Sequence, residues 1–237
     1  MYDVDLAAVG ALVGNPSRAA MLDALMTGRA LTATELARVA GVSAATASEH
    51  LARLQAGGLV EAVPQGRHRY HRLAGPEVGA ALEALSHIAP ERPVRSLRQS
   101  ARARSLATAR TCYDHLAGST GVAIHDGLLA REWLRAQPGA YELTDRGATG
   151  LTAWGVDVSA ARGARRALAR PCLDWTERRS HLAGSLAAAI ATALVDGPTP
   201  WFTRRAGDHR ALRVTELGGS RLAELGWRAG GAAERSA

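Results

Sequence analysis

The sequence has no lysine, only two cysteines, few aromatic residues and no long apolar run. Two cysteines, Cys112 and Cys172, are too few for a disulfide scaffold. No stretch of about 18 uncharged apolar residues is present to span a bilayer, and the N-terminus lacks the basic start and apolar core of a signal peptide. These absences favour a cytoplasmic protein over a secreted or membrane-spanning one.

The residues that are present predict a folded chain with an affinity for polyanions. Of the 237 residues, 47% are hydrophobic and 22% are charged, which is typical of globular domains. All 29 basic residues are arginine, and the formal net charge is +7. This balance favours acidic partners such as nucleic acid, although charge alone identifies none.

Apolar residues at helical spacing predict three helices in the first 60 residues. The first helix begins at the cap signal Asn15-Pro16-Ser17 and ends at Gly28. The second covers 35–40 and is capped by Thr32 or Thr34, and the third covers 44–55 and ends at Gly57-Gly58. Gly41 joins the second helix to the third through a tight turn. Two helices around such a turn form the helix-turn-helix plan.

A basic β-hairpin is predicted directly after these helices. A strand over 59–63 and a returning strand over 67–73 enclose a short turn, and a helix over 76–87 follows. A hairpin in this position is the wing of a winged helix-turn-helix, and cations in it suit the phosphate backbone or the minor groove. The wing residues expected to contact DNA are Arg67, Arg69 and His71.

The third helix has the pattern of a helix that enters the major groove of DNA. Ala47, Leu51 and Leu54 fall on one face and are expected to pack inward. The opposite face has short side chains near its start, which lets a helix enter the groove without meeting the sugar-phosphate walls. The expected DNA contacts at this helix are Ser43, Ala45, Thr46, Ser48, Glu49, His50 and Arg53.

These residues resemble the ArsR/SmtB family of winged-helix repressors over about residues 5 to 90. The motifs that carry the resemblance are Leu36-Ala37, Gly41-Val42-Ser43, the run from Ser48 to Leu54, Gly57-Gly58-Leu59-Val60 and Gly66-Arg67. The resemblance implies a homodimer that binds a dyad-symmetric operator and is released or modulated by an effector. The chain departs from the metal sites of the family, because 34–40 has no cysteine and the helix after the wing offers only Glu77, Glu83 and His87.

The second half contains an internal repeat, found by aligning 115–118 with 181–184. Trp133 matches Trp201, and the run Thr144, Gly147, Leu151, Gly155 matches Thr215, Gly218, Leu222, Gly226. Each copy is predicted to be a long helix, a β-hairpin and a closing helix. This half is also similar to a longer, actinobacterial-type branch of the same regulators, through 112–118 and 172–179.

The expected fold is therefore mainly α with small β elements. The predicted domains are a winged helix-turn-helix over 1–90, a linking or dimerisation helix over 91–111, and a repeat domain over 112–237 for effector sensing or dimerisation.

The cysteines and histidines of the repeat domain have three interpretations. Cys112 and His115 share a face of a predicted helix, and Cys172, Asp174 and His181 form a comparable group. Together they provide thiolate and imidazole ligands for a metal ion. Alternatively, a neighbouring arginine makes a cysteine an oxidisable thiol switch, or the cysteines and histidines are buried core residues. The sequence assures no cofactor.

Two further groups in this domain leave alternatives open. One group either lines a pocket for an organic effector or forms the core of the repeat. Its members are Tyr113, Trp154, Trp175 and Trp201. The run 174–179 is either an effector or partner contact or the capped start of a helix.

The sequence favours a transcriptional regulator that binds specific DNA sequences and acts as a repressor. It has no nucleophile elbow, phosphate-binding glycine loop, paired-histidine zinc motif or dinucleotide fingerprint, so no enzyme is predicted. The alternative function is a winged-helix module that binds proteins without reading DNA. The expected partners are double-stranded DNA, a second copy of the chain and a metal or small-molecule effector.

Overall fold

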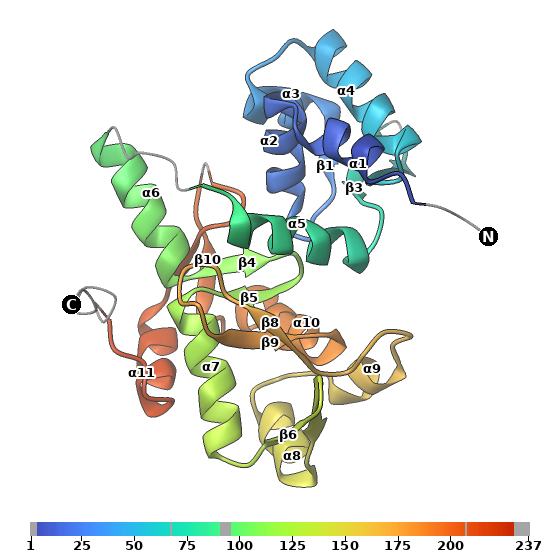
Figure 1. Ribbon diagram of the computed structural model, residues 1–237. Coiled ribbons are helices and arrows are strands. Elements are labelled where there is room, and N and C mark those ends of the chain that lie inside the picture. Colours follow the sequence, from blue (N-terminus) through green and yellow to red (C-terminus); the bar gives the residue numbers. More distant parts are fainter. Residues whose placement is uncertain (1–3, 67, 91–95, 207, 230–237) are drawn as a thin grey trace. The chain divides into compact units, whose positions relative to one another are not determined.

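The computed structural model describes residues 4–66, 68–90, 96–206 and 208–229 (Figure 1). The chain divides into two compact units, Met1–Leu85 and Ser86–Ala237. Helices predominate and every sheet is small and antiparallel, which confirms the predicted fold class. None of the helices in the described part of the chain is long and apolar enough to cross a membrane.

The N-terminal unit is a winged helix-turn-helix, as predicted. Its elements are α1 (Leu6–Val13), α2 (Pro16–Leu25), β1 (Leu31–Thr32), α3 (Ala33–Ala40), α4 (Ala44–Ala56), β2 (Val60–Gln65), β3 (His68–Leu73) and α5 (Pro76–Ile88), the last of which crosses the boundary between the units. The sheet order is β1-β3-β2. The core is made by side chains of α2, α3 and α4, among them Met21, Leu25, Leu36 and Leu51.

Local signals in the sequence account for most boundaries of this unit. Asn15 accepts hydrogen bonds from the first backbone N–H groups of α2, and Thr32 forms a capping box with Glu35 at α3. Gly41 ends α3 with a φ of 66°, a left-handed conformation that glycine adopts at little cost. Helix α1 was not predicted, because its composition carries no amphipathic periodicity.

The C-terminal unit begins with α6 (Leu97–Thr108), after which one order of elements occurs twice. The first series is β4 (Arg110–Cys112), β5 (His115–Ala117), α7 (Ser119–Ala130), β6 (Leu134–Gln137), β7 (Ala140–Leu143), α8 (Asp145–Ala153) and α9 (Val158–Gly163). The second is β8 (Arg170–Leu173), β9 (Ser180–Ala183), α10 (Ser185–Ala191), the π-helical turn η1 (Thr192–Asp196), β10 (Phe202–Arg204), β11 (Leu212–Val214) and α11 (Glu216–Glu224). Each series therefore runs hairpin, helix, hairpin, helix, and the first has the additional helix α9 at its end.

The prediction of a long helix at the start of each copy was wrong. His115–Ala117 and Ser180–Ala183 are strands, and the helices α7 and α10 begin only after them. Segments of only three or four residues do not distinguish strand from helix by periodicity, so the antiparallel pairing with β4 and β8 decides the structure.

The second hairpin of each series is closed by the same arrangement of residues. The Thr144 hydroxyl accepts from Gly147 N and donates to the Glu132 carbonyl, and Thr215 does the same with Gly218 N and the Pro200 carbonyl. A Cβ on Gly147 or Gly218 would lie 2.2 or 2.0 Å from a tryptophan carbonyl oxygen, so only glycine fits at these positions. This contact explains the conserved spacing between the two copies of the repeat.

Candidate DNA interface and cysteine-histidine cluster

Helix α4 presents the face that the sequence assigned to DNA. Ala47, Leu51 and Leu54 are buried, which confirms the expected inward face. Ser43 caps the helix by accepting from Thr46 N at 3.1 Å. The exposed residues at and beyond the cap include Ser43, Ala45, Ser48, Glu49 and Arg53. The first turns of this face therefore carry only small side chains, and Arg53 and Glu49 form an exposed ion pair of 2.6 Å further along.

Two residues of the expected contact set are less accessible. His50 is half-buried, and its Nδ1 atom is buried without a hydrogen-bond partner. Thr46 is also half-buried, and its hydroxyl lies 2.9 Å from the hydroxyl of Ser43. The accessible face is therefore narrower than the sequence pattern suggested.

The hairpin of β2 and β3 forms the wing, and it corrects the prediction for His71. Arg69 is exposed near the tip, whereas His71 is 4% exposed at the base of the hairpin. His71 is the register partner of buried Leu31 in β1 and shares a face of β3 with buried Leu73, so it lies in the core of the unit. Burial, with the charge of Arg69, lowers the pKa of His71 and favours its neutral form. Arg67, the third expected wing contact, lies outside the described residues.

In the C-terminal unit, four side chains converge on one point. Cys112 and His115 are register partners in the first hairpin, and Cys172 and His181 are register partners in the equivalent hairpin β8–β9. Their ligand atoms all lie within 4.8 Å of one another. We call these four residues the Cys/His cluster. Cys112 and His115 do not share a helix face as predicted; they meet across two strands, which produces the same proximity.

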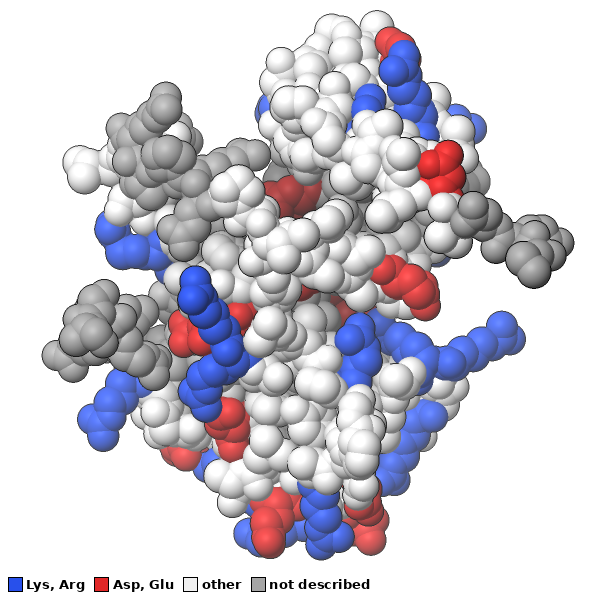
Figure 2. Space-filling model, viewed as in Figure 1, with Lys and Arg blue, Asp and Glu red and all other residues white. Residues whose placement is uncertain are grey.

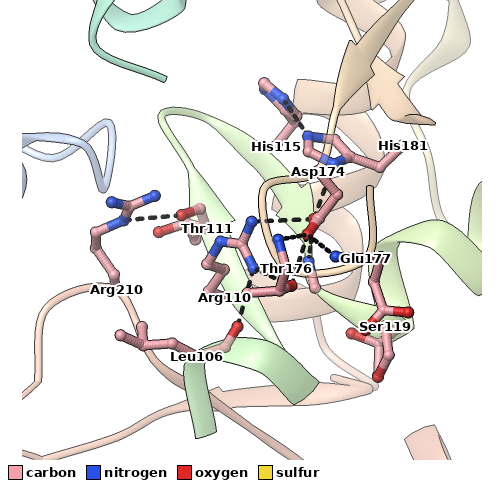
Figure 3. Close-up of polar contacts among 12 residues, drawn as sticks. Leu106, Arg110, Thr111, His115, Ser119, Asp174, Thr176, Glu177, His181 and Arg210 are labelled. Atoms are coloured by element: carbon pink, nitrogen blue, oxygen red, sulfur yellow. Dashed lines mark hydrogen bonds and ion pairs between the residues drawn. The ribbon is translucent and has the colours of Figure 1, made fainter. Parts of the chain in front are cut away.

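Both histidines of the cluster have a carboxylate on the ring nitrogen that faces away from their partner. His115 Nδ1 lies 3.2 Å from Asp114 Oδ1, and His181 Nδ1 lies 3.1 Å from Asp174 Oδ2. The Nε2 atoms of the two rings face each other at 3.2 Å (Figure 3). Each carboxylate is in turn paired with an arginine. These ion pairs are Arg166–Asp114 at 2.6 Å and Arg110–Asp174 at 3.0 Å.

Asp174 is therefore a support of the cluster and not a member of it. Its carboxylate is fully buried with Arg110 and His181, and it accepts hydrogen bonds from the backbone of Gly118, Thr176 and Glu177. The segment 174–179 is a tight turn between β8 and β9, so the predicted helix start at this place was wrong. The backbone N–H groups of Thr176 and Glu177, which were expected in the first turn of a helix, instead donate to the Asp174 carboxylate in this turn (Figure 3).

The charges of the cluster are set by these contacts. Hydrogen bonds from Cys112, and then from His115 and His181, lower the pKa of Cys172 to about 2, although burial opposes this shift. Burial would lower the pKa of His181, but its hydrogen bonds with Asp174 and Cys172 raise it to about 9. Burial likewise opposes ionisation of Asp174, yet His181 and the Arg110 charge hold its pKa well below the usual range. These contacts therefore favour the thiolate form of Cys172 and the protonated form of His181.

The aromatic residues proposed for an effector pocket are dispersed. Trp201 lies in the core of the C-terminal unit and Trp154 packs against it, with ring centroids 4.8 Å apart. Trp175 instead lies 4.5 Å from the Arg110 guanidinium, and Tyr113 is in the turn between β4 and β5. A pocket of about 310 Å³ elsewhere in the unit is bordered by polar residues such as Arg135 and Glu142 and by none of these four aromatics.

Sequence reasoning missed Asp114 and gave Arg110 a different role, that of an arginine beside a cysteine in a thiol switch. Arg110 was expected in the linking helix over 91–111, but it lies in β4 and is fully buried. Asp114 occupies the position in the first copy that Asp174 has in the second, two residues after the cysteine. The alignment of the two copies was therefore the signal that could have identified Asp114.

Comparison with known proteins places the chain among transcriptional regulators. A model described as a helix-turn-helix domain matches residues 13–63. The chain is 39% identical over 214 residues to the uncharacterized HTH-type transcriptional regulator YdfF of Bacillus subtilis, which covers 90% of this chain and 93% of that protein. It is 38% identical over 87 residues to the HTH-type transcriptional regulator Rv0324 of Mycobacterium tuberculosis, covering 36% of this chain and 38% of that protein.

Among solved structures, the homodimeric winged helix-turn-helix DNA-binding domain of Mb0332 from Mycobacterium bovis, described as a possible ArsR-family regulator, is similar at 32% identity. That alignment covers 35% of this chain and 76% of the other, with a TM-score of 0.33.

The names of both sequence relatives agree with the prediction of a non-catalytic protein. The extended match to YdfF, together with the helix-turn-helix described above, shows that the chain belongs to the HTH-type transcriptional regulators.

Proposed function

We propose that this regulator is a homodimeric repressor that reads its operator with α4 and the β2–β3 wing and responds to an effector in its C-terminal unit. The observation that carries the proposal is the exposed face of α4, where Ser43, Ala45 and Ser48 leave room for the edges of bases. Arg69 in the wing supplies positive charge for the phosphates. Within this proposal, α4 specifies the sequence and the wing contributes affinity.

Helix α1 supports the homodimer. All eight of its residues, Leu6–Val13, are apolar, and none is buried. Leu6 and Val9 are 79% and 39% exposed. The surface around α1 shows few charged side chains in Figure 2. An exposed helix without a polar face is stabilised by a partner that covers it, and a second copy provides an identical surface around a twofold axis. A dimer also matches an operator with two half-sites about 34 Å apart.

The Cys/His cluster supports a metal ion or an oxidant as the effector. The chemistry of this cluster changes on metal binding or oxidation, because thiolates are both metal ligands and nucleophiles. Neither cysteine is in a disulfide. We therefore expect zinc or a thiol oxidant to change the affinity of the chain for DNA.

The test of DNA binding is fluorescence anisotropy with a duplex from the region upstream of the protein's own gene and with a scrambled duplex. We expect preferential binding to the upstream duplex, and an affinity that falls by about 10³-fold or more between 50 and 200 mM salt if each dimer neutralises about six phosphates. Affinity that does not depend on salt, or no binding to either duplex, would instead support a protein-binding winged helix. Repeating the titration with zinc or an oxidant tests the response to an effector.

The test of the dimer is a Leu6→Glu substitution. A charged side chain on the exposed face of α1 is expected to produce a monomer in sedimentation velocity, because burying an unpaired carboxylate in the interface is costly. In the fluorescence anisotropy titration the variant should also bind the upstream duplex more weakly, since a monomer contacts one half-site. Leu217→Glu, at another exposed leucine in α11, is the control and should remain dimeric. A dimeric Leu6→Glu variant would exclude α1 from the interface.

A further inference from the structure

We infer that the Cys/His cluster is a closed, four-ligand site for one zinc-type divalent ion per chain, with ligands Cys112, His115, Cys172 and His181. The inference deepens the sensing role proposed above and rests on it only for the response at DNA. It also chooses between the two chemistries left open there. The site itself is argued from distances, ligand chemistry and charge balance.

The distances within the cluster fit a tetrahedral ion. Zinc–nitrogen bonds of about 2.0–2.1 Å at a tetrahedral angle separate two ligand nitrogens by about 3.3–3.4 Å. The Nε2 atoms of His115 and His181 are 3.2 Å apart. Zinc–sulfur bonds of about 2.3 Å separate two sulfurs by about 3.8 Å, and no pair of ligand atoms in the cluster exceeds 4.8 Å. The ligand atoms therefore lie within about 1–1.5 Å of the separations that a tetrahedral shell requires.

The surroundings of the two histidines are those of metal ligands. A histidine that binds zinc usually donates its other ring N–H to a carboxylate, which fixes the tautomer and orients the ring. Asp114 and Asp174 occupy this position at Nδ1 of His115 and His181, and each leaves Nε2 directed at the cluster. The arrangement occurs twice, once in each copy of the repeat. A buried core histidine needs no such matched pair of carboxylates.

Charge balance favours a dication in this place. Asp114 and Asp174 are already neutralised by Arg166 and Arg110. With a metal ion bound, the four side chains would be two thiolates and two neutral imidazoles with a total charge of −2, which one divalent cation cancels; any proton on these groups, such as that of His181, would be released on binding. A buried set of charges is stable only when it is paired in this way. Soft thiolates combined with imidazoles in a tetrahedral set select zinc over magnesium or calcium.

A thiol switch explains less of the geometry. Formation of a disulfide between Cys112 and Cys172 would remove two electrons and two protons from the thiols, and an external oxidant would have to accept them. That chemistry does not require two imidazoles aimed at the same point. The metal site uses all four side chains and both carboxylates. It would also join hairpin β4–β5 to hairpin β8–β9, and so couple the two copies of the repeat.

The test uses the full-length chain, stripped of metal and kept reduced, and titrates it with cobalt(II) and then zinc(II). We expect one cobalt ion per chain, with the strong visible absorption of a tetrahedral ion and a thiolate charge-transfer band, both abolished when zinc displaces cobalt. Because this spectrum is recorded on the wild-type chain, it does not depend on the folding of any variant. Cobalt bound without thiolate absorption, or no cobalt bound, would overturn the inference.

Variants and a thiol assay complete the test. Cys172 is half-buried, so Cys172→Ser should fold, which circular dichroism can verify. Removing a residue that hydrogen-bonds a metal ligand typically lowers metal affinity roughly 10- to 100-fold. Cys172→Ser removes a ligand itself, so its cobalt affinity should fall by more than this. His209→Gln, at an exposed histidine of the same unit, should bind cobalt normally. Rapid formation of a disulfide by a chain that takes up no metal would overturn the metal site in favour of a thiol switch.

The failure of the metal site and that of the regulator are separable. Cobalt binding is measured without DNA, and DNA binding is measured on the metal-free chain. A chain that binds its operator but takes up no metal would refute only the site. A chain that binds cobalt as expected but recognises no DNA would support the site and refute the proposed repressor.

Discussion

An Ala45→Glu substitution is expected to weaken binding to the operator duplex about 100-fold, without loss of folding. Ala45 is exposed in the first turn of α4, on the proposed DNA-facing surface. A carboxylate there would meet phosphates and acceptor groups of the groove. A dimer carries the change in both half-sites, and two penalties of about 1.4 kcal/mol each amount to about 100-fold. Fluorescence anisotropy on wild type and variant measures the difference.

Loss of binding in this variant could not be attributed to unfolding. A glutamate in the first turn of a helix interacts favourably with the helix dipole, so α4 should be slightly stabilised. The matched control is Ala56→Glu, which places the same side chain at the exposed C-terminal end of α4, about 16 Å further along the axis. We expect nearly wild-type affinity from the control. Equal losses in the two variants would indicate a general charge effect and would argue against α4 as the reading helix.

The N-terminal unit could be predicted because its signals are local. Caps such as Asn15 and Thr32, and the left-handed turn at Gly41, act within a few residues of sequence. The errors arose where a distant strand intervenes. His71 shares a face of β3 with Arg69 and Leu73, as alternation predicts, but this face is buried at His71 and Leu73 and exposed at Arg69. Alternation predicts on which face of the sheet a side chain lies, but not how far along the strand that face is buried.

In the C-terminal unit, the secondary structure was predicted poorly from local signals, whereas the grouping of distant residues was predicted well from the repeat. Short strands such as His115–Ala117 carry no periodicity, so the sequence suggested helices there. The repeat nevertheless grouped Cys112 and His115 with Cys172 and His181, which the structure brings together. The ion pair of Arg110 with Asp174 was not predicted, because long-range pairing of buried charges leaves no spacing signal, and Asp114 was overlooked although it aligns with Asp174 between the two copies.

The second large effect is expected from Asp174→Asn. This substitution keeps the size of the side chain and an oxygen for the backbone donors of Thr176 and Glu177, but it removes the charge opposite Arg110. Both partners of this ion pair are fully buried, and breaking such a pair by neutralising one partner costs about 3–5 kcal/mol. We expect the free energy of unfolding of the C-terminal unit to fall by that amount in metal-free protein.

The measurement is urea unfolding followed by tryptophan fluorescence. All five tryptophans lie between residues 133 and 227, so the signal reports the C-terminal unit alone. Asp126→Asn is the control, since its ion pair with Arg179 is exposed and pairs of that kind contribute less than about 1 kcal/mol. If Asp174→Asn were as stable as this control, the Trp175 ring and the Leu106 carbonyl would be sufficient partners for the Arg110 guanidinium. The carboxylate would then serve to orient His181, and its loss would appear in cobalt affinity and not in stability.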